Sequence, residues 1–120
     1  MSRVVIQDNN LVVTMQGVRK FVALKSEVSV PLANVVGVTS GLDQKELPAL
    51  FTPRAGANIG VYTGGTFFQD GNKVFYDLKR KEDAVVITLQ GEDFERLVIG
   101  VDDPAATTQL IEEALRIRHV

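Results

Sequence analysis

The chain has 120 residues, of which 45% are apolar and 23% are charged, and no long polar or charged block interrupts them. This composition excludes a disordered protein and fits one domain that spans residues 1–120. Cysteine is absent, which excludes disulfides, thiolate metal sites and a thiol nucleophile. The net charge of −2 gives no long-range attraction to nucleic acid, and no apolar run approaches the ~20 residues of a transmembrane helix.

The first predicted strand covers residues 11–15 and follows a turn signal at Asp8, Asn9 and Asn10. The same three polar residues interrupt the N-terminal apolar run well short of a signal-peptide core, so no leader is expected. Segment 17–25 places apolar residues at near-helical spacing. It fits either a short helical turn or another strand, and the spacing favours the turn.

Residues 27–32 alternate between apolar and polar and predict a strand that ends near Pro31, because proline favours strand ends and edges. A further strand is predicted over residues 34–40. The stretch 41–60 is the one long irregular region. Loops of this length in compact domains are often functional, so this stretch is a candidate for binding.

Three more apolar runs follow over residues 73–78, 84–89 and 95–101, the first of them after an Asp70-Gly71 turn signal. Runs at such regular spacing are typical of an antiparallel meander. No strand–helix–strand alternation occurs, so a parallel sheet is not expected.

The C-terminus predicts an amphipathic helix from about Pro104 to near Arg118. Asp103 can accept hydrogen bonds from the first backbone N–H groups, and proline at the first position loses no hydrogen bond. The expected apolar stripe that packs on the sheet comprises Ala106, Leu110, Ala114 and Ile117, widened by Ile111 and Leu115.

Several phrases resemble those of the small bacterial pleckstrin-homology (PH) domain proteins of unknown function, in the same order along the chain. They are EVSVPLANVVGV, AGANIGVYTGGTF, KVFYDL, AVVITL and FERLVIGVDDP, and the likeness covers residues 11 to 115. The resemblance implies a mainly β fold, a PH-like barrel of about seven antiparallel strands capped by a C-terminal α-helix. It also implies a cytoplasmic location. Such barrels host lipid, peptide and assembly roles, so it implies no single function.

The first hairpin departs from the phosphoinositide-binding PH pattern, because Arg19 and Lys20 are its only adjacent basic pair. Phosphoinositide binding is therefore not expected. The glycines at 56, 60, 64 and 65 do not form a phosphate-binding loop either, because Thr66 stands where a P-loop has lysine. Their spacing fails the dinucleotide fingerprint too. They suit bends, bulges and close backbone approach in a strand.

No catalytic or cofactor-binding group of residues can be assembled. The adjacent carboxylates occur in turns, at a helix cap and on a polar helix face: Glu92 and Asp93, Asp102 and Asp103, Glu112 and Glu113. The single histidine, His119, is next to the last residue and suits the negative end of the helix dipole. The chain is therefore expected not to be an enzyme and to bind no cofactor or metal.

Two groups of residues are candidates for binding. The stronger is an interaction surface on the aromatic and uncharged strand segments, which comprises Val38, Val61, Phe67, Phe68, Phe75 and Tyr76. Uncharged strand edges favour pairing with another chain. The weaker is a possible anion contact at the basic turn Lys79, Arg80 and Lys81, whose field is reduced by Asp77, Glu82 and Asp83.

The sequence thus predicts a non-catalytic binding or assembly module that forms a homo-oligomer or binds a protein partner. The alternative is a small-ligand or lipid-headgroup binding domain that uses the 41–60 loop and the 79–81 basic turn. A further alternative for the assembly state is a monomer in which the 41–60 loop folds over the strand edge.

Overall fold

The computed structural model describes residues 2–15, 27–41, 55–59, 62–69, 71–79 and 83–118. Within these ranges the chain forms nine strands, one 3₁₀ turn and one C-terminal helix, so the predicted mainly β class is confirmed. The elements are β1 (Arg3–Gln7), β2 (Asn10–Thr14), β3 (Glu27–Pro31), η1 (Leu32–Asn34), β4 (Val35–Ser40), β5 (Ala55–Ile59), β6 (Tyr62–Gln69), β7 (Asn72–Leu78), β8 (Ala84–Leu89), β9 (Arg96–Gly100) and α2 (Pro104–Arg118).

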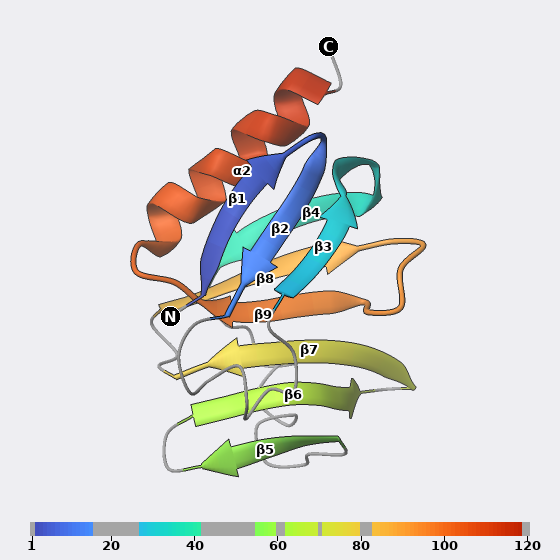
Figure 1. Ribbon diagram of the computed structural model, residues 1–120, viewed down its shortest axis with the longest axis vertical. Helices are drawn as coiled ribbons and strands as arrows, with labels where there is room; N and C mark the ends of the chain where they lie inside the picture. The colour runs from blue at the N-terminus through green and yellow to red at the C-terminus, as the bar shows by residue number, and fades with distance from the viewer. Residues whose placement is uncertain are drawn as a thin grey trace.

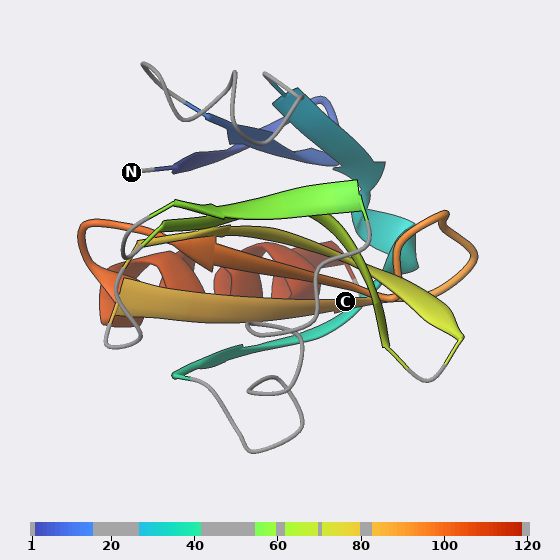
Figure 2. The same cartoon turned by 90° about the horizontal axis from the view of Figure 1, so that it is seen from below.

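The strands form two separate sheets. The smaller has the order β1-β2-β3, and the larger has the order β4-β8-β9-β7-β6-β5. The small sheet lies across one face of the large sheet, at its β4–β9 half, and α2 lies beyond β4 at the end of the molecule (Figures 1 and 2). The two sheets are not closed into a barrel, so that part of the fold prediction is not met.

The first hairpin shows why the turn signal was informative. Asp8 and Asn9 both have positive φ, 53° and 65°, the conformation that tight hairpins require and that these two residue types tolerate. The turn therefore joins β2 to a strand that the sequence analysis did not predict. In β1 the side chains of Val4 and Ile6 pack on the core, and Arg3 is exposed.

The chain passes from the small sheet to the large one through η1. Pro31 ends β3 as expected, and the Leu32 side chain is buried. The Leu32 amide donates a hydrogen bond to the Asn9 carbonyl oxygen at 2.9 Å. On the other side, the Gln90 amide donates to the Asn34 carbonyl oxygen at 2.9 Å. These two bonds tie η1 to a turn of each sheet.

The expectation of an entirely antiparallel sheet is wrong at one position. β9 lies between β8 and β7, and it pairs antiparallel with β8 but parallel with β7. All five residues of β9 are buried. A strand whose side chains are apolar on both faces is most stable at the centre of a sheet, because both of its faces are shielded from water there. The chain therefore skips one position after β7 and returns to fill it.

The irregular stretch 41–60 also needs correction, because residues 55–59 form β5. This strand pairs antiparallel with β6 in regular register from Ala55↔Thr66 to Ile59↔Tyr62. Gly56 is opposite Gly65, which has a φ of 105° and thus uses the freedom that only glycine has. Residues 17–25 and 42–54 lie outside the described residues, so the predictions for them stay untested.

The helix has the predicted bounds, and its buried face covers only one side of the predicted stripe. The Ala106 amide donates to Asp103 Oδ1 at 3.0 Å, which confirms the N-cap. Ile111 is fully buried, whereas Leu110 is 43% and Ile117 is 67% exposed. Ile111 and the partly buried Ala114 and Leu115 pack on the main core, so this side of the predicted stripe is confirmed and its Leu110–Ile117 side is wrong.

The central strands of the large sheet, β7, β8 and β9, are buried on both faces. Side chains from β7, β8 and β9 that face the small sheet and α2 form the main core with residues such as Leu11, Val13 and Ile111. The next residues along each strand form a second cluster on the opposite face: Phe67, Val74, Tyr76, Leu78, Ala84, Val86 and Val98. Successive strand residues point to opposite faces, so these central strands contribute to both clusters.

Candidate assembly surfaces

The predicted aromatic surface is not a surface. Phe67, Phe75 and Tyr76 are each 0% exposed, and only Phe68 is exposed, at 43%. Phe67 and Tyr76 come from the paired strands β6 and β7, and their ring centroids lie 5.2 Å apart in an edge-to-face arrangement. This aromatic contact between the two strands lies inside the second cluster. Phe75 and Tyr76, predicted to belong to an interaction surface, are buried because both faces of β7 are covered.

The two valines predicted for the same surface, Val38 and Val61, do not form an exposed apolar group in the described structure either. Val38 is partly buried and packs against the main core, so it does not present an exposed apolar group. Val61 lies outside the described residues. The exposed valine of β4 is Val36, at 58%, where the register shifts between Val35 and Gly37. Val36 points away from the buried Val35, as alternation predicts, whereas the β-bulge shifts the alternation by one residue and places Val38 opposite Ile87 on the core side.

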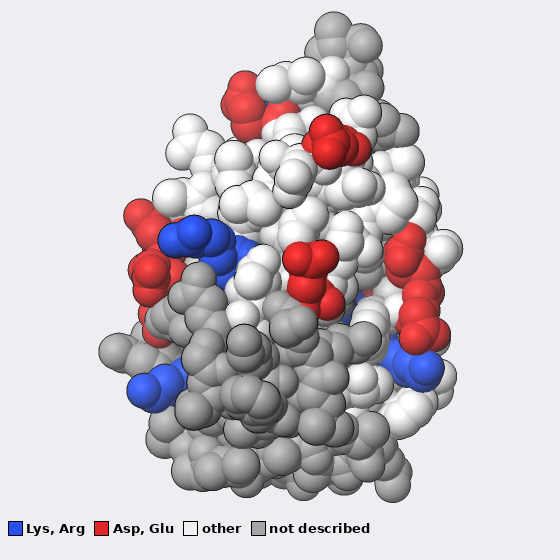
Figure 3. Space-filling view, viewed as in Figure 1, with Lys and Arg blue, Asp and Glu red and all other residues white. Residues whose placement is uncertain are grey.

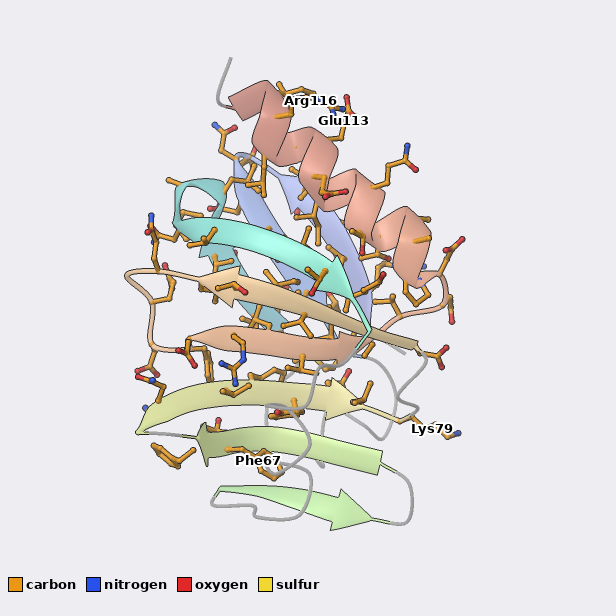
Figure 4. All side chains as sticks on the ribbon, turned by 180° about the vertical axis from the view of Figure 1, so that it is seen from behind. Phe67, Lys79, Glu113 and Arg116 are labelled. Atoms are coloured by element: carbon orange, nitrogen blue, oxygen red, sulfur yellow. The ribbon has the colours of Figure 1, made fainter. Side chains whose placement is uncertain are left out.

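The basic turn is described at one position only. Lys79 is exposed at the end of β7 and extends away from the sheet (Figure 4). Arg80 and Lys81 lie outside the described residues. Asp77, expected to reduce the field of this turn, is instead 0% exposed and accepts a hydrogen bond from Ser2 Oγ. Of the three residues of the possible anion contact, the structure thus describes only Lys79.

The Ser2–Asp77 contact fixes the start of the described chain to the large sheet. Besides the side-chain bond, the Ser2 amide donates to the Gly100 carbonyl oxygen at 2.9 Å. The other buried charge is Arg96, whose Nη1 donates to Glu95 Oε2 at 2.6 Å. Within the described ranges, no three of the residues His, Cys, Asp and Glu are grouped so that they could hold a metal ion.

Charged side chains concentrate at the ends of the strands rather than across the small sheet (Figure 3). At one end, Lys73 Nζ lies 3.2 Å from Asp93 Oδ2, and both side chains are exposed to solvent. On the outer side of α2, Arg116 pairs with Glu113 (Figure 4). Exposed pairs of this kind contribute little to stability, so they do not define a site.

Among the described strands, four end the two sheets: β1 and β3 in the small sheet, β4 and β5 in the large one. Of the uncharged segments, 34–40 lies at an edge, because β4 ends the large sheet among the described strands. The segment that contains Phe67 and Phe68 does not, because β6 lies between β5 and β7. The edge on that side is β5, with the sequence AGANI, which also has no charged residue.

The chain matches no protein-family model, no curated protein and no solved structure. Across the described residues, the helix is neither long nor apolar enough to cross a membrane.

Proposed function

We propose that this chain is a non-catalytic binding or assembly module that self-associates. The observation that carries the proposal is that the large sheet ends on both sides in strands without a charged residue, β4 (VVGVTS) and β5 (AGANI). A terminal strand presents backbone N–H and C=O groups that can pair with another chain, and charged residues commonly prevent this.

The proposal includes the PH-like architecture. Two sheets with a C-terminal helix that closes one end support it. The parallel pairing of β7 with β9 is a departure from a simple meander, and so is the division of nine strands into two open sheets. PH-like barrels host lipid, peptide and assembly roles, so an assembly role is compatible with this architecture.

Light scattering on the purified protein tests self-association directly. We expect a mass of at least twice the 13.1 kDa of one chain at micromolar concentrations, with dissociation on dilution. The physical reason is that an unpaired strand edge gains backbone hydrogen bonds and loses contact with water when two copies meet. A mass of one chain at every concentration would contradict the proposal.

The alternative, a lipid-headgroup binder, is tested with vesicles. We expect no saturable binding to vesicles that contain phosphatidylserine and phosphoinositides at ~0.15 M salt, where exposed charges are largely screened beyond ~8 Å. The net charge of −2 and the exposed position of Lys79 away from the sheet support this expectation. Binding that is saturable and is weakened by Lys79→Glu would instead favour the alternative.

A further inference from the structure

We propose that the chain dimerises through β5, which pairs antiparallel with β5 of a second copy around a two-fold axis at Ala57. This inference rests on the proposed self-association and specifies its edge, its partner and its register. It follows from a comparison of the four terminal strands and from the regular geometry of β5.

The two edges of the small sheet carry features that oppose pairing with another chain. β1 begins with the exposed Arg3, and α2 packs beside it. β3 begins with the exposed Glu27 and ends with Pro31, which has no N–H to donate. Edge charges and prolines of this kind prevent strand addition, because pairing would desolvate the charge or leave a carbonyl oxygen without a donor.

β4 has no charge, but its geometry opposes pairing. The bulge at Val36 interrupts the regular spacing of its backbone groups. α2 also packs against this strand more than against any other element. Bulges and covering helices are two of the ways in which proteins keep an edge from pairing. The described part of β4 is therefore a poor template for a second chain.

Among the residues that the structure describes, β5 has none of these four features. Its sequence AGANI contains no charge and no proline, and its pairing with β6 is regular over all five residues. It lies at one end of the long axis of the molecule, and among the described strands only β6 pairs with it (Figure 1). A regular strand exposes evenly repeated N–H and C=O groups on its outer edge, which is the geometry that strand addition uses.

A second copy of β5 is the occupant that this edge fits. Closed two-fold dimers are the commonest assemblies of identical chains, and they require a surface that complements itself. A two-fold axis normal to the sheet makes the two β5 strands antiparallel. No like charges then meet across the interface, because AGANI has none. The two large sheets would become one continuous sheet.

The register follows from symmetry and length. An axis normal to the sheet places one residue opposite its own copy, and only an axis at Ala57, the middle residue of Ala55–Ile59, pairs all five residues. Ala55 then lies opposite Ile59 of the second copy, and Gly56 opposite Asn58. An axis at Gly56 or Asn58 keeps the strands antiparallel but pairs fewer residues, so it forms fewer backbone hydrogen bonds.

Because the chain has no cysteine, single cysteines can report this register. In Ala57→Cys the two cysteines are directly opposite, at the ~4.5–5.5 Å Cα separation of antiparallel pairs, which disulfides span. Oxidised glutathione accepts the two electrons and the thiol protons as the bond forms. We expect a covalent dimer on a non-reducing gel. The matched control Ala55→Cys should give little, since its two copies lie about 13 Å apart along the strands.

A charge variant tests the same edge without covalent chemistry. Ala57→Lys places two ammonium groups opposite each other, and we expect the dimer Kd to rise about five-fold. Val36→Lys on β4 is the control and should leave Kd unchanged. Circular dichroism and the unfolding midpoint confirm that each variant is folded.

The outcomes separate this inference from the proposed function. A wild-type monomer overturns both. A wild-type dimer that Val36→Lys weakens and Ala57→Lys does not keeps the self-association and overturns β5 as its edge. A disulfide in Asn58→Cys but not in Ala57→Cys overturns the register. A disulfide in Ala57→Cys, with little in Ala55→Cys, supports the proposal.

Discussion

Replacing Phe67 by alanine is expected to destabilise the folded chain by about 3–5 kcal/mol, whereas the same change at Phe68 is expected to cost about 1 kcal/mol or less. The two residues are neighbours on β6 with identical side chains. Phe67 is 0% exposed and contacts Tyr76 edge-to-face, while Phe68 is 43% exposed. Loss of Phe67 leaves a cavity in the second cluster, and loss of Phe68 leaves a partly solvated surface.

Urea unfolding followed by circular dichroism measures both changes, with tyrosine fluorescence as a second probe of the same cluster. The pair is its own control, because backbone propensity and composition change equally in the two variants. Equal effects on the unfolding free energy would contradict the burial of Phe67. A loss confined to Phe68→Ala would mean that the faces of β6 are reversed.

The sequence predicts the features of this fold that a local signal determines, such as turns and helix ends. The turn at Asp8 and Asn9 needs residues that tolerate positive φ, and the sequence supplies them. The N-cap at Asp103 is equally local, because one carboxylate meets an N–H three residues later. Both features are set within a few residues, so the sequence alone identified them.

The arrangement of the strands could not be predicted in the same way. β9 joins β7 in parallel because burial on both faces favours a central place, and this depends on the whole sheet. β5 was missed because glycine and alanine carry little apolar signal, although Gly56 has a regular partner in Gly65. The candidate edge therefore moved from β6 to β5, one strand further out.

Prediction of the candidate site was limited in the same way, because it too depends on the whole sheet. Which aromatic side chain is exposed depends on what covers each face of the sheet, and alternation alone gives only the relative direction of neighbours. Phe67 and Phe68 fit that rule, while Phe75 and Tyr76 are both buried because β7 is covered on both faces. Val38 packs against the core because a bulge, which has no signature in the sequence, shifts the alternation of β4 by one residue.

Ile111→Ala is expected to reduce the unfolding free energy by about 2–5 kcal/mol, because it removes a fully buried side chain where α2 meets the main core. Leu110→Ala is the matched control on the same turn of the helix. Leu110 is 43% exposed, so its loss should cost about 1 kcal/mol or less. Both changes introduce alanine, whose helix propensity is the highest, so propensity does not explain a loss.

The comparison distinguishes between two orientations of the helix. The apolar stripe through Leu110 and Ile117 predicts that Leu110→Ala is the costly change, and the docked face through Ile111 predicts the reverse. Thermal and urea unfolding of the two variants, at a concentration where the assembly state is the same, decides the matter. Because Ile117 is 67% exposed at the far end of the predicted stripe, Ile117→Ala should behave like Leu110→Ala. If Ile111→Ala leaves the midpoint unchanged, then α2 does not close the core between the two sheets.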